Sequence, residues 1–247
     1  MNITDVANIE RATITAVSPQ AVEELTGWLL SFNTGTVGRA ISAVPLTHSF
    51  EGDVEALVAK IESRYVAYGF KAAFRLPDVV SFAPLRDYLA KVGYRMEQPT
   101  LVQTGSTVSM RKMADQLLAE VADTPDADWA QLFLGEGFDP VDGAHRVALL
   151  SRAKGTAYAS VRLEGETVAG GAGSFSHGWA SVHGMRTVLH RRGEGLAKQV
   201  LAFLAQMALD RGYKNVFLQV EAENSSAQAL YKQAGFETAW QYAYWRK

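Results

Sequence analysis

The residues His190-Arg191-Arg192-Gly193-Glu194-Gly195 form a short polar turn of a kind that can bind an anion. A strand is predicted just before the turn, over residues 179–185. A helix is predicted just after it, because apolar side chains recur there at three- and four-residue spacings: Leu196, Val200, Phe203, Leu204, Met207 and Ala208. Glycines at such a corner leave backbone N–H groups accessible, and the helix dipole adds partial positive charge. The turn therefore predicts a site for a pyrophosphate, although two glycines can also serve only to let the chain turn sharply.

A second set of polar residues follows later in the chain. Gly212-Tyr213-Lys214 leads into a predicted strand over residues 216–220. The segment Asn224-Ser225-Ser226-Ala227-Gln228-Ala229-Leu230-Tyr231 then predicts a short helix that Asn224 can cap, and Gly235-Phe236 follows it. Taken alone, Tyr231 is better explained as an aromatic residue at the edge of the core.

The two sets, in this order and between these elements, resemble the motifs of the GNAT superfamily of acyl-CoA-dependent N-acyltransferases. The family pattern Gln/Arg-x-x-Gly-x-Gly/Ala falls on His190, Gly193 and Gly195. The family pattern Asn-x-x-Ala-x-x-Leu-Tyr falls on Asn224, Ala227, Leu230 and Tyr231. The resemblance implies an α/β (α+β) fold with a mixed, mostly antiparallel sheet flanked by helices, and acetyl-CoA as the cosubstrate.

The resemblance also assigns roles to individual residues. Polar contacts to the pantetheine arm and to the carbonyl oxygen are expected from the chain at Met185 and Thr187. The pyrophosphate is expected on the turn and first helical residues, and Asn224 is expected to position the cofactor or its helix. The cofactor-binding residues of the turn are His190, Arg191, Arg192, Gly193, Glu194, Gly195, Leu196 and Ala197. Tyr231 is expected to act as general acid toward the leaving thiolate, because a phenol stays protonated at neutral pH.

The general base is less clearly indicated. His183 and Ser181 alternate along the strand before the turn and point the same way, and Glu221 ends the next strand. Histidine has the better intrinsic pKa for accepting a proton near neutrality. His183 can equally be a hydrogen-bonded, half-buried histidine, and water can carry the proton without a single responsible side chain.

Two residues depart from the family pattern at the turn. His190 stands where the family has Gln or Arg, and it carries charge only when it is protonated. Glu194 places a carboxylate inside an anion-binding turn, where Arg191 and Arg192 must offset it. Weaker or pH-sensitive CoA binding is the expected consequence.

Composition excludes several other classes of function. The chain has 247 residues, of which 48% are hydrophobic and 20% charged, as in soluble globular proteins. A formal net charge of −2 argues against a nucleic-acid partner. There is no cysteine, which excludes an acyl-thiol enzyme intermediate, and the five histidines lack metal-ligand spacing, so no metal is expected. Neither a secretory signal at residues 1–17 nor a membrane span is predicted, so the cytoplasm is the expected compartment.

The order of predicted elements repeats along the chain. Subtracting 143 takes Gly212 to Gly69 and Lys214 to Lys71, and subtracting 142 takes Gly235 to Gly93. We interpret this as two GNAT-like units, residues 1–107 and 108–247, although two α/β halves can share such turn residues between strands and helices by chance. In the first unit Phe50, Leu89 and Phe82 stand at the positions of Gly193, Tyr231 and Asn224. The first unit is therefore expected to be degenerate, with a structural role or a role as one wall of the acceptor cleft.

Several elements are predicted from local pattern alone. Helices are expected over residues 19–30, 53–66, 83–91, 113–121, 126–134 and 142–152, and strands over 39–46, 72–76, 158–163 and 167–175. Gly170, Gly171 and Gly173 lie inside the last of these strands, so a close-packed or bulged strand is favoured over a phosphate loop. The aromatic segment 240–245 is expected to close the sheet, with a dimer interface as the alternative.

The sequence thus predicts an N-acetyltransferase that moves an acetyl group from acetyl-CoA to a primary amine of a small molecule or peptide. Transfer is expected by direct attack in a ternary complex. The alternative is a non-catalytic acyl-CoA-binding sensor or interaction module. No nucleic-acid or membrane partner is expected, and the protein is expected to be a monomer or a homodimer.

Overall fold

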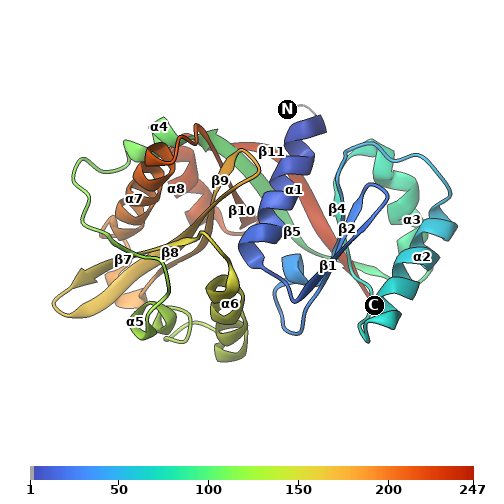
Figure 1. Cartoon of the computed structure of the whole chain (residues 1–247), viewed down its shortest axis with the longest axis horizontal. Coiled ribbons are helices and arrows are strands. Elements are labelled where there is room, and N and C mark those ends of the chain that lie inside the picture. Colours follow the sequence, from blue (N-terminus) through green and yellow to red (C-terminus); the bar gives the residue numbers. More distant parts are fainter. Residues whose placement is uncertain (1–2) are drawn as a thin grey trace.

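A computed structural model describes residues 3–247, which form a single open sheet with helices on both faces (Figure 1). The α-helices are α1 (Ile3–Val17), α2 (Val54–Ala67), α3 (Ala83–Lys91), α4 (Thr107–Arg111), α5 (Ala127–Gln131), α6 (Pro140–Arg152), α7 (Leu196–Asp210) and α8 (Ser225–Gln233). Short 3₁₀ turns are η1 (Gly38–Ala40), η2 (Val80–Phe82) and η3 (Leu189–Arg191). The strands are β1 (Ala21–Leu25), β2 (Trp28–Phe32), β3 (Ala43–Pro45), β4 (Phe74–Pro77), β5 (Arg95–Ser106), β6 (Glu120–Ala122), β7 (Ala157–Leu163), β8 (Glu166–Ser176), β9 (Trp179–Thr187), β10 (Asn215–Glu221) and β11 (Glu237–Arg246).

The sheet has eleven strands in the order β1-β2-β3-β4-β11-β5-β10-β9-β8-β7-β6. Among the pairs that the structure describes, β3 with β4 and β9 with β10 are parallel, and the others are antiparallel. The expected mixed, mostly antiparallel sheet is therefore confirmed. The strands of the first half are nevertheless continuous with those of the second in one sheet. This continuity was not predicted from the sequence.

The two halves exchange a strand at the centre of this sheet. β5 belongs to the first half of the chain but lies between β10 and β11 of the second. β11 ends the chain but also pairs with β4 of the first half. Figure 1 shows β5 and β11 crossing the middle of the molecule side by side. The aromatic segment of β11, residues 240–245, is thus a central strand with a partner on each side, and it does not close the sheet at an edge.

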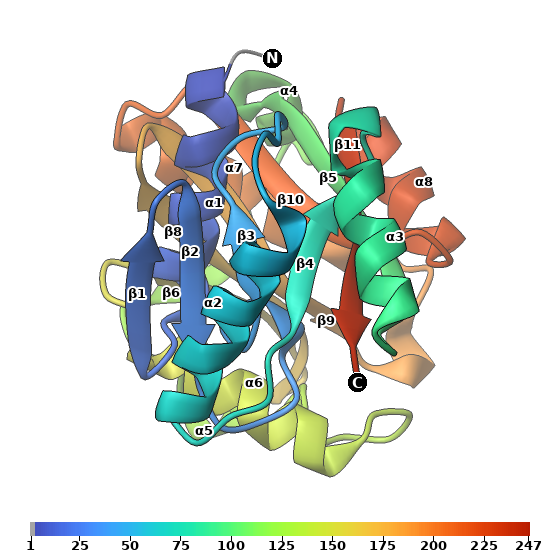
Figure 2. The same ribbon diagram turned by 90° about the vertical axis from the view of Figure 1, so that its right-hand side faces the viewer.

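Helices cover both faces of the strands of the second half. On β10, Val216, Leu218 and Val220 join the core formed with α7, whereas Phe217 points to the opposite face. That opposite face is covered by α1, whose Ile9 packs with Phe217 in one hydrophobic cluster. In the first half, α2 and α3 lie in front of β2, β3 and β4 in the view of Figure 2. A helix from the first half therefore covers the sheet of the second.

The predicted helix over residues 19–30 is wrong, because this segment forms the β1–β2 hairpin. Gly27 at the turn has a φ of +78°. Glycine adopts this left-handed conformation readily, and the conformation interrupts a helix. All five residues of β2 are buried, so both of its faces are covered. The first helix is instead α1, which precedes the hairpin and whose apolar spacing of Val6, Ile9 and Ala16 carried a usable signal.

Two other predicted elements are also corrected. The predicted helix over residues 113–121 is not formed; the short helix α4 ends before it and β6 begins within it. The predicted strand over residues 39–46 is reduced to β3, because η1 occupies its first part. The other predicted helices and strands are present within a few residues, and α2 is capped by Asp53, whose carboxylate accepts a hydrogen bond from the N–H of Ala56.

The three glycines of β8 make room for neighbouring side chains, as the close-packed strand interpretation predicted. A Cβ on Gly170 would lie 2.6 Å from the Leu132 side chain, and a Cβ on Gly171 would lie 2.6 Å from the sulfur of Met185. The register between β8 and β9 shifts at the same place. These glycines therefore allow β9 to bulge beside the cleft described next.

Candidate functional site

Strands β9 and β10 separate from one another and create a cleft. Their parallel pairing is limited to Ala180, Ser181 and Val182 on β9 opposite Val216, Phe217 and Leu218 on β10. Beyond these pairs, residues 183–187 and 219–221 line a cleft of about 640 Å³. The polar edges of two diverging strands are thereby exposed at the middle of the sheet. An extended ligand can pair with strand backbone at such a place.

A bulge in β9 increases this opening. Gly170 of β8 pairs with Arg186, and Ala172 pairs with His183, so Gly184 and Met185 of β9 face the single residue Gly171. Gly184 has a φ of +60°, and a Cβ there would lie 3.0 Å from the Phe133 and Leu150 side chains. In a bulge the extra residue is left out of the ladder. Because Gly184 and Met185 both line the cleft, this backbone is placed to contact a ligand there.

The glycine turn lies at the other end of the cleft, where α7 begins. Gly193 and Gly195 have φ values of +87° and +78°, and a Cβ on either would meet no atom within 4 Å. Gly195 is the N-cap of α7 and provides no capping side chain, so no side chain satisfies the first N–H groups of the helix there. Leu196, Ala197 and Lys198 follow along the wall of the cleft. The expected anion site is thus open to the cleft.

The charged residues of the turn are divided between the cleft and the solvent. Arg191 and Arg192 line the cleft, whereas His190 and Glu194 lie outside the lining. Glu194 accepts a hydrogen bond from Nε of Arg191 at 3.0 Å, so the carboxylate is offset by the expected partner. His190 lies 3.4 Å from a carboxylate oxygen of Glu166 on β8. The structure therefore gives His190 no direct position in the cleft wall.

Helix α8 brings Asn224 and Tyr231 to the opposite wall. Oδ1 of Asn224 accepts a hydrogen bond from the N–H of Ala227 at 3.1 Å, which confirms the predicted cap. Tyr231 is 8% exposed and meets the ring of Phe236 edge-on at 6.0 Å. Burial raises the pKa of Tyr231 to about 12, although the charge of Arg186 opposes this shift. The phenol therefore remains protonated at neutral pH and can serve as a proton donor.

His183 lies deep in the same cleft. Its Nε2 is 2.8 Å from the hydroxyl oxygen of Ser181, and its Nδ1 is buried and has no hydrogen-bond partner among the described residues. Burial, assisted by the charge of Arg39, lowers the pKa of His183 to about 3. The imidazole is therefore neutral at physiological pH. An imidazole with so low a pKa binds a proton only weakly at neutral pH, whereas a general base works best when its pKa lies near the operating pH.

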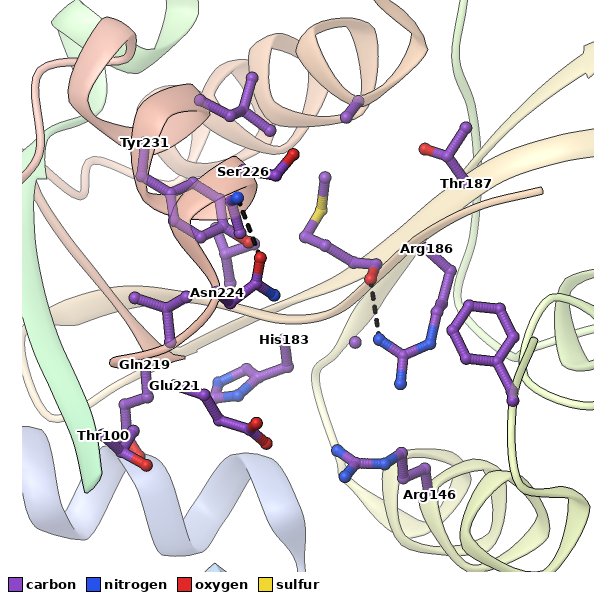
Figure 3. Close-up of a pocket in the computed structure, with 18 of the residues that line it drawn as sticks. Thr100, Arg146, His183, Arg186, Thr187, Gln219, Glu221, Asn224, Ser226 and Tyr231 are labelled. Atoms are coloured by element: carbon purple, nitrogen blue, oxygen red, sulfur yellow. Dashed lines mark hydrogen bonds between the residues drawn. The ribbon is translucent and has the colours of Figure 1, made fainter. Parts of the chain in front are cut away.

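Glu221 contributes a carboxylate at the end of β10. It is exposed and accepts a hydrogen bond from Nε2 of Gln98 on β5 at 2.7 Å. Figure 3 shows Glu221 and His183 on the same side of the cleft, below Asn224 and Tyr231. The first half of the chain thus reaches the site through Gln98 and Thr100 of the exchanged strand, and through residues 36–39 before and within η1.

Several lining residues were not found from the sequence. They are Arg39, Arg146, Arg186, Gln219, Tyr242 and Tyr244. Gln219 connects three of the elements, because its Oε1 accepts a hydrogen bond from the Tyr242 hydroxyl at 2.8 Å and its Nε2 donates to Thr13 of α1 at 2.8 Å. These residues come from separate elements and share no motif. The strand alternation that placed His183 could have indicated Gln219, since it occupies the same face of β10 as the predicted Glu221.

The low pKa of His183 predicts a loss of stability in acid. Between the ordinary value of 6.5 and the folded value of about 3, the unfolded chain binds a proton that the folded chain does not. The free energy of unfolding should therefore decrease as the pH falls, by about 1.4 kcal/mol per pH unit from this group. His183→Gln should remove that part of the slope in urea denaturation between about pH 7 and pH 4. Parallel curves for parent and variant would contradict the burial of this imidazole.

None of the helices formed by residues 3–247 has the length and apolar character that a membrane crossing requires. Within the same range, no group of three or more His, Asp or Glu side chains is arranged to hold a metal ion.

Comparisons with known proteins agree with this geometry. A family model described as "Probable histone acetyltransferase Rv0428c C-terminal" matches residues 3–245. The chain is 25% identical over 237 residues to the uncharacterized N-acetyltransferase YobR of Bacillus subtilis (strain 168), and the match covers 94% of each protein. The fold is similar to that of a GCN5-related N-acetyltransferase from Kribbella flavida, with a TM-score of 0.71 and 15% identity over 98% of this chain and 95% of that one.

A second solved structure of similar fold is described as a tandem protein. It is a tandem GNAT protein from the clavulanic acid biosynthesis pathway, with a TM-score of 0.62 and 13% identity. The match covers 98% of this chain and 95% of that chain. At this level of identity, the similarity concerns the fold.

Proposed function

Because the chain belongs to the family described as the C-terminal part of the probable histone acetyltransferase Rv0428c, and is an acetyltransferase of the GNAT type, we propose that it transfers an acetyl group from acetyl-CoA to a primary amine. The observation that supports this most directly is the continuity of the cleft. It runs from the two open glycines at the start of α7, along the end of β9 that does not pair with β10, to Tyr231 on α8. The acceptor is an amine of a small molecule or of a peptide.

The residues of the cleft fit the parts of acetyl-CoA. The pyrophosphate would be held by the N–H groups that follow Gly195, with Arg191 and Arg192 beside them. The pantetheine arm would lie along the backbone of Met185 and Thr187, on the side of β9 that no longer pairs with β10. Asn224 would keep α8 in place through its cap. Leu196 and Ala197 would form the floor, since Leu196 is buried against the core behind α7.

The chemical step would be a direct attack of the amine on the thioester carbonyl. The absence of cysteine from the sequence leaves no thiol to carry the acetyl group. The bulged backbone of β9 would donate a hydrogen bond to the carbonyl oxygen as it gains negative charge. Tyr231 would donate its proton to the leaving thiolate.

The attacking amine must first lose a proton. Glu221 is the acidic residue of the cleft lining and would attract the acceptor's ammonium group, from which the proton would pass to solvent. His183, as a neutral imidazole, would accept a hydrogen bond from the amine without storing its proton. In this scheme Glu221 and His183 position the amine, and water removes the proton.

The repeated element order supports the proposal of two GNAT-like units, residues 1–107 and 108–247, of which the second is catalytic. The first half contains a helix, three strands, a helix, a strand, a helix and a last strand, and the second half has the same order from α6 onward, after α4, β6 and α5. The counterparts of Tyr231 and Asn224 in the first half, Leu89 and Phe82, are fully buried in its core. The first half would thus have no general acid of its own.

The proposal is tested by measuring thiol release from acetyl-CoA with a panel of primary amines, and by mass spectrometry of the acetylated products. Turnover with at least one amine, and one CoA bound per chain in calorimetry, is expected. A protein that binds acetyl-CoA but never releases thiol with any amine, including lysine-containing peptides, would be a sensor. Two CoA molecules per chain would contradict the degenerate first half.

A further inference from the structure

Basic residues dominate the wall of the cleft away from the glycine turn. Arg39 of η1, Arg146 of α6 and Arg186 of β9 line this part, in addition to Arg191, Arg192 and Lys198 near α7. Over the part of the chain that the structure describes, Glu221 is the single acidic residue of the lining. An amine acceptor is itself a cation before it reacts. A wall with this many arginines therefore indicates that the acceptor carries a second group, which the arginines can bind.

Arg186 is held in place but incompletely paired. Its guanidinium lies over the rings of Phe138 at 4.6 Å and Phe133 at 5.3 Å, and Nη1 donates to the carbonyl of Met185 at 3.1 Å. Its Nε is buried and has no hydrogen-bond partner among the described residues. Burial, together with the charge of Arg146, lowers the pKa of Arg186 to about 10. The charge of Arg186 is thus kept in the cleft without a full set of acceptors.

Arg146 faces the same space from α6. Its Nε donates to Oδ2 of Asp142 at 2.5 Å, and Oδ1 of Asp142 also accepts a hydrogen bond from the Thr36 hydroxyl at 2.7 Å. Figure 3 shows the guanidinium group of Arg146, from α6, below that of Arg186, from β9, with both on the side of the picture away from Tyr231. One carboxylate, Asp142, lies near two guanidinium groups, so a net positive charge remains between them.

The position of Arg146 separates this pair from the glycine turn, although the charge of Arg192 also acts on Arg186. Arg146 belongs to α6, which packs against α1, and α1 covers the face of β10 opposite to that covered by α7. The glycine turn and its own arginines, Arg191 and Arg192, lie at the start of α7. An anion between Arg146 and Arg186 would therefore belong to the acceptor.

We propose that the acceptor is a small amine that also carries an anionic group, a carboxylate or a phosphate, bound between Arg146 and Arg186. This inference rests on the proposed acetyl transfer and specifies its acceptor. Arginine pairs bind such planar or tetrahedral oxyanions with charge-assisted hydrogen bonds. The amino group would then lie on the side of the cleft where Glu221, His183 and Tyr231 are found. A basic peptide tail would bring further cations against the same arginines and is disfavoured.

The test uses pairs of amines that differ only in the anionic group. L-lysine is compared with cadaverine, L-phenylalanine with phenethylamine, and O-phosphoethanolamine with ethanolamine, at saturating acetyl-CoA. At least one anionic member should have a kcat/KM about tenfold or more above that of its partner. The pair that shows the preference distinguishes carboxylate from phosphate. Equal values within all pairs, or a preference for the amines without the anion, would overturn the inference.

Arg146→Gln is the informative variant, because Arg146 is half-buried on a helix and its loss is tolerated more easily than that of Arg186. The ratio of kcat/KM within the preferred pair should fall about tenfold or more in Arg146→Gln and about as far in Arg146→Lys, which keeps the charge but not the planar fork. Lys154→Gln removes one charge from an exposed position outside the cleft and should keep the parental ratio. An unchanged ratio in Arg146→Gln would also overturn the inference.

Failure of the proposed acetyl transfer is distinguished by a binding measurement. If no amine is acetylated, the acetyl-transfer proposal fails, but the anion site can still be measured by calorimetry in the presence of CoA. N-acetyl-L-phenylalanine should then bind more tightly than N-acetylphenethylamine to the parent, and the difference should be lost in Arg146→Gln. Equal binding of the two compounds to the parent would refute the anion site itself.

Discussion

Replacing Tyr231 with phenylalanine is expected to lower kcat about 100- to 10,000-fold, which is the range that general acids contribute. The reason is that burial holds the pKa of this phenol at about 12, so it is protonated throughout the neutral range and can donate to a thiolate. The ring would be kept, and with it the edge-on contact to Phe236. Steady-state kinetics with acetyl-CoA should therefore show a low kcat and a nearly unchanged KM for acetyl-CoA.

Tyr213→Phe is the matched control for this prediction. Tyr213 also packs against a phenylalanine ring, that of Phe175 at 5.8 Å, but it lies outside the lining of the cleft. Its variant should retain the parental kcat. A Tyr231→Phe variant as fast as the parent would remove Tyr231 from the mechanism, and the thiolate would then have to be protonated by water.

Replacing Gly195 with aspartate is expected to raise the Kd for acetyl-CoA about a hundredfold or more. The carboxylate would occupy the open space at the start of α7 and would take up the N–H groups that the pyrophosphate needs. Two unit charges about 4 Å apart near a protein surface repel one another by about 4 kcal/mol, which is enough for this loss of affinity. Isothermal titration calorimetry with CoA and with acetyl-CoA measures the effect.

Gly212→Asp is an unusually close control, because Gly195 and Gly212 flank the same helix. Their φ values are +78° and +80°, and a Cβ on either glycine would meet no atom within 4 Å. The two variants therefore carry similar backbone strain, and only the first places its charge at the anion site. If both variants bind acetyl-CoA as tightly as the parent does, the pyrophosphate is bound elsewhere.

The end of the cleft at the glycine turn was predictable because its signals are local. The strand before the turn, Gly193 and Gly195, and the Asn224 cap each depend on residues close in sequence, and the structure places them in these elements. The arginine-lined end of the cleft was not predictable in the same way. Arg39, Arg146 and Arg186 are far apart in the sequence and belong to three elements that only the complete fold brings to one wall.

The incorrect predictions about the fold have similar physical causes. Val22, Leu25 and Leu29 have the spacing of a helical face, but the pattern also fits a hairpin whose second strand is buried on both sides. Burial of the second strand in the folded protein favours the hairpin over the helix. Gly27 was the local residue that indicates a turn. The strand exchange could not be read from the sequence, because the two halves resemble one another and β5 and β11 offer similar hydrogen-bonding edges to either neighbour.

The position of β5 also makes the second half of the chain depend on the first. A shortened chain that began at residue 108 would lose the strand that hydrogen-bonds β10 along its length and that supplies Gln98 beside Glu221. The exposed edge of β10 would then be free to associate with strands of other molecules. Removal of residues 1–107 would therefore leave the sheet around the cleft incomplete, so the cleft depends on a strand from each half of the chain.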